Sequence, residues 1–503
     1  MLAIVLAVGV VAWRLVDIQI VDTATYTEWG NPQRSAQLEL AADRGSILDR
    51  NLNALAVSDD RPTIWIDPAL VDDPLATANA LATVMDVDAQ ELAQRIASGG
   101  RFLYVDRQVE PAVGNAVLEL ALGGVVVSQE PSRLLPNGSE FASGLIGRVD
   151  VDQTALTGLE LQYDELLRGV AGFESYERGR DGTLLPNGNR ELLAATSGED
   201  LVLTIHRETQ FLAEQILIEQ VEATESRGGV AVILRAGTGE VLASAGVKRD
   251  PETGIASPAS YNMAYLDVYE PGSVNKVFTV SAALEAGLVR PDTEFDVPWL
   301  YDYSDKTFVE PFSTGTGLMT VQDIVARSSN IGTIKIAELV GPVRLRSHLD
   351  ALGFGRFTAS DGAQSVPDES AGMIPDEFFG TELATIAFGQ GVALTPVQVA
   401  AAYNTIANQG RYVAPTLVRG TVDQEGELHT WPTAPGRQVM SEDTAAKLTV
   451  MLEAVVVDGT GVLASVDGYR VAGKTGTAQK PIAGGYSATD YMSTFVGFVP
   501  ADS

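Results

Sequence analysis

A serine and a lysine stand three residues apart where the sequence predicts the start of a helix. Pro271 and Gly272 interrupt the preceding chain, and apolar residues recur at helical spacing from Val277 onward. We therefore expect Ser273 in the first turn, with Lys276 on the same helix face. A hydroxyl beside a neutral amine is a nucleophile with its base, and the free N–H groups of a helix start can hold an oxyanion. The alternative is a plain capped helix with a solvent-facing lysine, because Ser-x-x-Lys is common by chance.

A second candidate is Ser328 with Asn330, which follow a stretch of helical pattern over residues 321–327. A hydroxyl and a carboxamide two residues apart can face one site from a turn. An ordinary polar turn or helix cap is the alternative, since serine and asparagine favour both. Ser260 and Asn262 fit the same spacing but lack a regular helix before them.

The third candidate is a predicted strand over residues 471–479 that carries Lys474, Thr475, Gly476 and Thr477. Such a strand presents one positive charge and two hydroxyl donors. The missing side chain of Gly476 is expected to let a substrate backbone lie close to the strand. A phosphate loop, which also contains Gly-Lys-Thr, is the alternative that we set aside on the spacing of its glycines; a solvent-facing edge strand remains open.

The charge balance and the residue counts argue against several classes of partner and of active site. The chain has 503 residues, with 34 Lys and Arg against 66 Asp and Glu, so its formal net charge is −32. This excess argues against a nucleic-acid partner, which needs clustered basic residues. No cysteine is present and only three histidines occur, His206, His348 and His429, which leaves little material for a metal centre or a Ser-His-Asp triad. We expect no metal and no cofactor.

The N-terminal residues 2–13 are all apolar, and Arg14 ends the run. A membrane-spanning helix needs about 20 residues, so a run of this length also fits a signal peptide or a buried helix. No basic residue precedes it and no small-x-small cleavage site follows it. We interpret residues 1–21 as part of a transmembrane anchor; its orientation cannot be derived from flanking charges.

The rest of the chain divides into two expected domains. Residues 22–195 mix short strands and turns with one helical stretch near residues 76–96, and a Gly-rich segment over 179–198 is expected to be a linker or exposed hairpin. Residues 196–503 begin with a predicted helix, 209–221, and a hairpin of strands 229–234 and 240–244. A sheet with helices gathered after its first hairpin is an α+β (mixed α/β) fold.

Taken together, the three candidates resemble the ordered motif set of penicillin-binding proteins and serine β-lactamases. The serines of the first two motifs are 328 − 273 = 55 residues apart, and Lys474 follows Ser328 by 146. The segment from Arg44 to Asn51 resembles the entry motif of class B penicillin-binding proteins, although Leu52 stands where the family usually has glycine. Further matches are Leu55-Ala56, Gly158–Glu160, Tyr163-Asp164, Leu167–Gly169, Phe388–Gly391, Leu394–Pro396 and, in part, Arg133–Pro136.

The resemblance implies a central antiparallel sheet flanked by helices, preceded by an elongated pedestal over residues 22–195. It also implies a role for each residue of the first two motifs. Ser273 would attack the D-Ala-D-Ala carbonyl and form an acyl-enzyme, with Lys276 as its base. Ser328 would pass a proton to the leaving amine, and Asn330 would orient Lys276 and the substrate amide.

For the third motif, the resemblance implies that Lys474 supplies positive potential and that Thr475 and Thr477 bind the terminal carboxylate of the substrate, with Gly476 in the same substrate-binding strand. The backbone N–H groups of Ser273 and Thr477 would form the oxyanion hole. The function implied is a β-lactam-sensitive peptidoglycan D,D-transpeptidase, closest to the cell-division type, at the outer side of the cytoplasmic membrane.

Four alternatives were weighed against this function. They are an elongation-type transpeptidase, a β-lactamase-like hydrolase, a bifunctional class A enzyme and a catalytically silent scaffold. The pedestal argues against the hydrolase, the absence of a recognisable glycosyltransferase segment against the class A enzyme, and the intact motifs against the scaffold. The resemblance implies stem peptides, β-lactams, the membrane, a glycosyltransferase and division proteins as partners.

The end of the chain leads to a further expectation. In the family fold, one more strand follows the strand predicted over 493–499 and lies between it and the strand 229–234. We therefore expect a gap in the sheet at this place, a catalytic domain truncated at its C-terminus and poor solubility.

Overall fold

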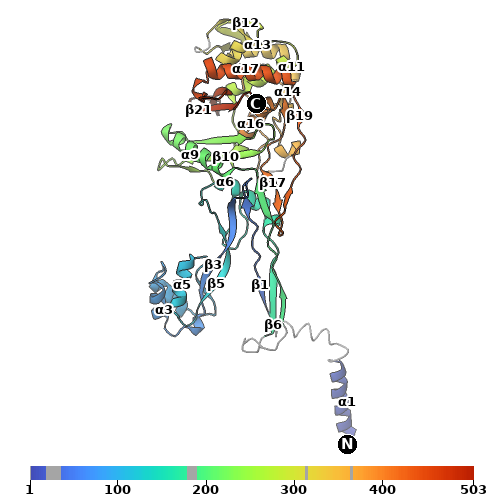
Figure 1. Ribbon diagram of the computed structural model, residues 1–503. Coiled ribbons are helices and arrows are strands. Elements are labelled where there is room, and N and C mark those ends of the chain that lie inside the picture. The colour runs from blue at the N-terminus through green and yellow to red at the C-terminus, as the bar shows by residue number, and fades with distance from the viewer. Residues whose placement is uncertain (1, 18–34, 178–189, 312–314, 363–365, 503) are drawn as a thin grey trace.

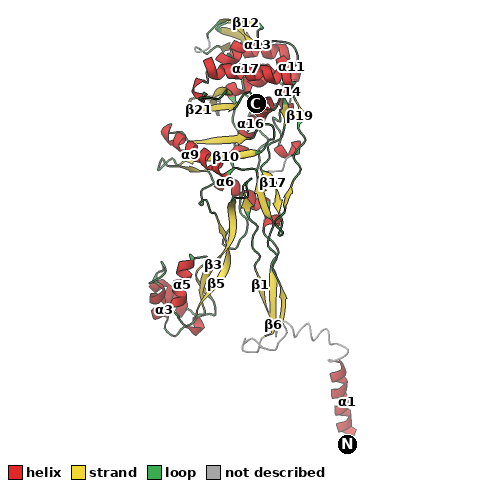
Figure 2. Ribbon diagram, in the orientation of Figure 1, coloured by secondary structure: helices red, strands yellow, loops and turns green. Residues whose placement is uncertain are grey.

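The computed structural model describes residues 2–17, 35–177, 190–311, 315–362 and 366–502. Figure 1 shows an elongated molecule, in which the C-terminal helices and strands form one end and long strands lead away from them. Most of the long helices gather at the C-terminal end, and the pedestal combines long strands with a separate group of helices, as Figure 2 shows. The fold is the mixed α and β class expected from the sequence.

The first helix, α1, spans Leu2–Val16 and carries the apolar run expected from the sequence. Within the described part of the chain, no helix combines the length and the apolar character needed to cross a membrane. Residues 18–21 of the expected anchor lie outside the described residues.

The pedestal consists of two groups of strands. One sheet pairs β1 with β6 and β6 with β7, all antiparallel. The long strand β3 pairs with β4 and β5, and three helices pack on this unit around Ile64, Ile66, Leu81 and Ile96. The elements are β1 (Ser35–Leu40), β2 (Ile47–Leu48), β3 (Ala54–Ile66), η2 (Pro68–Leu70), α3 (Pro74–Leu81), α4 (Ala89–Ala97), β4 (Leu103–Asp106), α5 (Pro111–Glu119), β5 (Val125–Leu134), α6 (Ser143–Ile146), α7 (Gly158–Gln162), α8 (Asp164–Leu167), β6 (Gly172–Glu177) and β7 (Arg190–Leu193).

The single helical stretch expected near residues 76–96 is wrong, because two helices occupy this region. Asp73 accepts hydrogen bonds from Leu75 and Ala76 and begins α3, and Asp88 accepts one from Glu91 and begins α4. Two aspartate caps start two helices, since each satisfies backbone N–H groups that have no partner within its own helix. Most of the expected linker lies outside the described residues, and its last part contains β7.

A continuous sheet crosses the domain boundary expected at residue 196. Its strand order is β18-β17-β8-β2-β3-β4, where β8 spans Asp200–Leu203. On one side β8 pairs with β17 (Val418–Val422) of the C-terminal part, and on the other it pairs in parallel with β2 of the pedestal. The two parts are therefore joined by backbone hydrogen bonds and not only by a linker.

The C-terminal part contains the predicted hairpin, formed by β9 and β10, and a second hairpin formed by β20 and β21. Its elements are α9 (Arg207–Ala223), β9 (Gly228–Leu234), β10 (Val241–Arg249), β11 (Ala256–Pro258), α10 (Met263–Leu266), η3 (Gly272–Asn275), α11 (Lys276–Glu285), β12 (Glu294–Val297), β13 (Leu300–Tyr303), β14 (Lys306–Val309), β15 (Gly317–Thr320), α12 (Val321–Arg327), α13 (Asn330–Val340), α14 (Pro342–Ala351), η4 (Thr358–Asp361), α15 (Glu382–Ala387), α16 (Pro396–Ala407), β16 (Arg411–Tyr412), β18 (Leu428–Thr430), β19 (Arg437–Gln438), α17 (Glu442–Asp458), η5 (Val462–Ala464), β20 (Ala472–Ile482) and β21 (Gly485–Phe498).

Among the described residues, no pairing joins β9 to β21. β9 is the edge of the sheet β11-β10-β9, and β21 pairs with β20 in a separate two-stranded sheet. This is the gap expected from the sequence. The main core lies beside the second hairpin, where α11, α13 and α17 bury residues such as Phe278, Ile334 and Leu452.

Candidate active site

The predicted nucleophile lies in a tight turn that continues into α11, a helix buried along most of its length. Ser273 belongs to the 3₁₀ turn η3, and its carbonyl accepts a hydrogen bond from the N–H of Lys276, the first residue of α11. Gly272 adopts φ +55°, a left-handed conformation that suits glycine, and its N–H donates to the Gly389 carbonyl at 3.0 Å. The turn expected from Pro271 and Gly272 is confirmed, with Ser273 partly exposed among buried neighbours.

Lys276 is 1% exposed and its ammonium group meets the second motif. Its Nζ donates to Ser328 O at 2.5 Å and to Asn330 Oδ1 at 2.6 Å, and lies 3.2 Å from Ser328 Oγ. Burial and, second, the charge of Lys474 hold the pKa of Lys276 well below its ordinary value, while Glu310 acts in the opposite direction. The structure therefore supplies the conditions under which this lysine can be neutral.

The second motif is positioned by two consecutive helices. Thr320 and Asp323 form a capping box that begins α12, and Ser328 ends this helix in a left-handed conformation with φ +63°. Ser329 then caps α13 by accepting from the Gly332 N–H, which leaves Asn330 in the first helical position. The similar pair Ser260 and Asn262 has another use, because Asn262 Oδ1 accepts from Ser244 Oγ at 2.9 Å.

The third motif lies on β20 as expected. Lys474 is fully buried, its Nζ donates to the Thr475 carbonyl at 3.0 Å, and burial lowers its pKa to about 7. Gly468 and Gly473 do match the spacing of a phosphate loop, so spacing alone does not exclude one. The strand excludes it, because a phosphate loop must lead into a helix that begins at this lysine.

Gly476 brings the first and third motifs together. A Cβ atom at this position would lie 3.0 Å from both Pro271 O and Val274 Cγ1. Gly272 is equally close to the strand, since its Cβ would lie 3.1 Å from Ala478 Cβ. The missing side chain of Gly476 thus lets the nucleophile turn pack on β20. Contact of a substrate backbone with the strand at Gly476, expected from the sequence, stays a prediction.

Thr460 is a residue that the sequence analysis missed. Its Oγ1, just after the end of α17, lies 2.6 Å from Oγ1 of Thr475 on β20, 15 residues further along the chain. Its own N–H lies 3.4 Å from the Ala326 carbonyl at the end of α12. Only a Gly-Thr-Gly turn marks this position in the sequence, and such turns are common. Within the described ranges, no group of His, Asp and Glu side chains is suited to hold a metal ion.

The pedestal motifs meet in a buried ionic network. Arg44, 3% exposed, pairs with Glu160 at 2.5 Å and with Asp164 at 2.6 Å, and Arg133 pairs with the other oxygen of Glu160 at 2.7 Å. Burial lowers the pKa of Arg133, although Glu160 opposes the shift. Four residues of separate sequence motifs therefore form one structural unit far from Lys276 in the chain.

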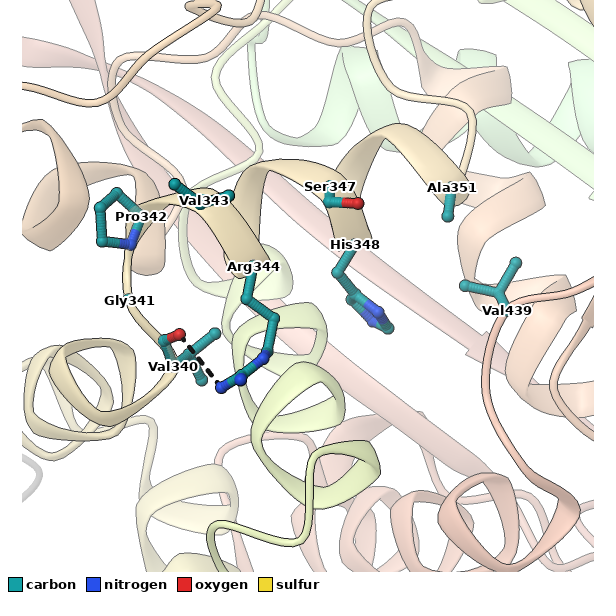
Figure 3. Close-up of a pocket in the computed structure, with 9 residues that line it drawn as sticks. All are labelled: Val340, Gly341, Pro342, Val343, Arg344, Ser347, His348, Ala351 and Val439. Atoms are coloured by element: carbon teal, nitrogen blue, oxygen red, sulfur yellow. Dashed lines mark hydrogen bonds between the residues drawn. The ribbon is translucent and has the colours of Figure 1, made fainter.

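A serine–histidine pair, Ser281 and His348, lies away from the candidate active site. His348 lines a surface hollow of about 620 Å³, formed mainly by α14 and Val439 (Figure 3). His348 Nε2 lies 2.6 Å from Ser281 Oγ, and Ser281 Oγ donates its proton to the Phe278 carbonyl at 2.8 Å. Nε2 must then be the donor, so this histidine cannot act as a base toward the serine. Burial lowers the pKa of His348 to about 4, and the pair serves to join α11 to α14.

Comparisons with known proteins agree with this geometry. The family model for the penicillin-binding protein transpeptidase domain matches residues 229–503, and the model for the penicillin-binding protein dimerisation domain matches residues 39–203. Penicillin-binding protein PbpB of Mycolicibacterium smegmatis is 33% identical over an alignment of 504 residues that covers 92% of this chain and 77% of that protein. Peptidoglycan D,D-transpeptidase FtsI of Escherichia coli is 30% identical over 518 residues, with 100% and 83% covered. The crystal structure of penicillin-binding protein 3 of Mycobacterium tuberculosis with ampicillin has a TM-score of 0.70 at 29% identity, covering 93% of this chain and 88% of that one.

A serine turn, a buried lysine and a Lys-Thr-Gly strand on this fold define a serine acyl-transfer enzyme. The chain belongs to the class B penicillin-binding proteins, among relatives of the cell-division type. The resemblance stated from the sequence is confirmed.

Proposed function

We propose that this chain is a peptidoglycan D,D-transpeptidase that cross-links stem peptides during cell division. One observation carries the proposal: Lys276, one turn after Ser273, is buried and held by Ser328 and Asn330. A neutral amine in this place can remove the proton of a serine hydroxyl, and the sequence of the pedestal, residues 22–195, contains no lysine that could form a comparable pair.

The reaction proceeds in two acyl transfers. Neutral Lys276 takes the Ser273 proton as Oγ attacks the carbonyl between the two D-alanines of one stem. The tetrahedral oxyanion is held by the N–H groups of Ser273 and Thr477. On collapse, the C–N bond breaks and the leaving D-alanine amine receives a proton through Ser328. The amine of a second stem then attacks the acyl-enzyme, forms the cross-link and releases Ser273.

Asn330 orients Lys276 and the substrate amide during both transfers. On β20, Lys474 and the hydroxyls of Thr475 and Thr477 receive the terminal carboxylate of the donor stem. A β-lactam follows the first transfer only, because its ring opens without releasing a leaving group from the site.

The cellular setting is part of the same proposal. The segment that includes α1 anchors the chain in the cytoplasmic membrane, and the catalytic domain lies outside it, where peptidoglycan is assembled. The pedestal, residues 22–195, positions the catalytic domain and contacts a partner glycosyltransferase and division proteins.

Labelling of the full chain with a fluorescent penicillin, followed by peptide mapping, tests the proposal. The label is expected on the peptide that contains Ser273, and Ser273→Ala is expected to remove it while circular dichroism stays unchanged. Ser260→Ala, at the similar but unconnected motif, is the matched control and keeps the label. Label on any peptide without Ser273 would overturn the assignment.

A further inference from the structure

A buried glutamate lies behind the Lys276 site. Glu310 follows β14, is 1% exposed, and its N–H donates to the Trp299 carbonyl at 3.0 Å. Its carboxylate accepts from two successive backbone N–H groups, those of Asn330 at 3.1 Å through Oε1 and of Ile331 at 2.8 Å through Oε2. A carboxylate is costly to bury unless it is hydrogen-bonded in this way.

These bonds complete the start of α13. The first N–H groups of a helix have no partner inside the helix. Here the first two donate to Glu310, and the third, of Gly332, donates to Ser329 Oγ at 2.9 Å. The negative charge of Glu310 also lies at the positive end of the helix dipole. The carboxylate, together with the cap residue Ser329, thus stabilises the first turn of α13.

The same turn holds the base. Asn330 donates its backbone N–H to Glu310, and its side-chain Oδ1 accepts from Lys276 Nζ, so one residue connects the carboxylate to the ammonium group. The groups that act on the charge of Lys276 are Lys474 from β20, which favours loss of the proton, and Glu310, which opposes it. Ser328 and Asn330, which touch Nζ, are uncharged.

We propose that Glu310 is a positioning residue for acylation: its carboxylate holds the first turn of α13, and thereby Asn330, in place, and its negative charge, connected to Lys276 Nζ through Asn330, opposes loss of the lysine proton. The proposal rests on the proposed function of Ser273 and Lys276. Glu310 itself touches neither substrate nor nucleophile and acts through Asn330.

The test is the rate constant for acylation of the full chain by a fluorescent penicillin, measured from pH 5 to 10. In Glu310→Gln the side chain keeps its shape but loses its charge, and one of the two N–H groups loses its acceptor. We expect the acid limb of the profile to move to lower pH by about one unit, because an opposing charge has been removed. We also expect the plateau rate to fall about 10-fold, because Asn330 is held less firmly.

Two further variants separate this effect from loss of stability. Glu310→Asp keeps the charge but moves the carboxylate away from the N–H groups at the start of α13. The plateau of its acylation rate should therefore fall, while the acid limb of its pH profile stays at the same pH as in the parent. This variant decides the matter if Glu310→Gln does not fold. Glu285→Gln is the matched control, because Glu285 Oε2 accepts from the N–H of Ser441 at the start of α17. It should lower the melting temperature and leave the acid limb in place.

The outcomes are distinct. If the parent protein is not acylated at Ser273, the proposed function fails. If the parent is acylated and the acid limb of Glu310→Gln coincides with that of the parent, or moves equally in Glu285→Gln, only the role of Glu310 is overturned. An unchanged plateau in Glu310→Asp would also overturn the positioning role.

Discussion

Lys276 Nζ lies 2.6 Å from Asn330 Oδ1, although 54 residues separate them in the chain. A second acceptor, the carbonyl of Ser328, lies 2.5 Å from the same nitrogen. A neutral amine has two N–H donors and one lone pair, and these two oxygens engage both donors. The lone pair is then left for a hydroxyl, either Ser328 Oγ at 3.2 Å or the nucleophile one turn away. The arrangement orients the base as well as holding it.

The first prediction concerns the need for a lone pair. In Lys276→Arg the guanidinium keeps the positive charge but stays protonated and offers no lone pair. We expect penicillin acylation to fall by about 10³-fold, within the usual range for loss of a general base. Stopped-flow labelling measures the rate and near-ultraviolet circular dichroism checks the fold. A folded arginine variant that is acylated at the parent rate would remove Lys276 from the mechanism.

The second prediction concerns the stability cost of Lys474. Its pKa falls from 10.5 to about 7 on folding, so the unfolded chain binds more protons between these values and the parent gains stability as pH rises through this window. Lys474→Met, which removes the buried charge but keeps an unbranched chain, should be more stable than the parent by a few kcal/mol at pH 7. This advantage should shrink toward pH 10. Urea unfolding at both pH values measures it, and an advantage that grows with pH would contradict the assignment.

The third prediction concerns the contact between Gly476 and the nucleophile turn. In Gly476→Ala the new Cβ would lie 3.0 Å from Pro271 O, a backbone atom that cannot easily move. Overpacking of this kind costs about 1–3 kcal/mol, which in the activation barrier would make acylation about 5- to 150-fold slower. Gly123→Ala is the control, since the nearest atom to its Cβ would be Leu70 O at 3.6 Å. Equal acylation rates in the two variants would show that the turn tolerates displacement.

The fourth prediction concerns Thr460. If Thr460 donates to Thr475 Oγ1, the proton of Thr475 is free to bind a carboxylate. Thr460→Val keeps the shape and removes this partner, at a cost of about 0.5–1.5 kcal/mol for one hydrogen bond. We expect weaker initial binding of penicillin, by about 3- to 10-fold, with the acylation step itself little changed. A change confined to the acylation step would mean that Thr460 acts on the nucleophile turn and not on the carboxylate site.

The fifth prediction concerns the pedestal network. Arg44→Met leaves Glu160 buried with Arg133 as its remaining cation, and loss of one partner of a buried pair costs about 3–5 kcal/mol. Arg227→Met is the control, because Arg227 is 79% exposed in its pair with Asp490 and should change stability by at most about 0.5 kcal/mol. Urea unfolding of both variants measures the difference. Equal midpoints would mean that the buried pair does not stabilise the pedestal.

Local chemistry explains what could be derived from the sequence by itself. The three motifs could be found because acyl transfer needs particular residue types. These types and their order can be read from the sequence without knowing which residues lie close together in the fold. The helix that begins at Pro396 was also predictable, since Thr395 and Gln398 satisfy each other's backbone N–H groups within one turn. The turn that holds Ser273 could also be expected, because Pro271 fixes its own φ and Gly272 tolerates the left-handed φ of +55° that the turn requires.

The tertiary structure alone decided which residues meet. Thr460 and Thr475, or Glu310 and Asn330, come from separate elements that only packing brings together. Helix α9 shows most clearly that apolar spacing alone does not predict the buried face of a helix. Leu212 and Ile216, spaced as an apolar face, are exposed, whereas Gln210 and Glu214 are buried. Gln210 binds both the N–H and the carbonyl of Ser244, and Glu214 accepts the N–H of Ala142. Buried backbone groups must find partners, and which side chain provides them depends on neighbours that the periodicity of one helix does not contain.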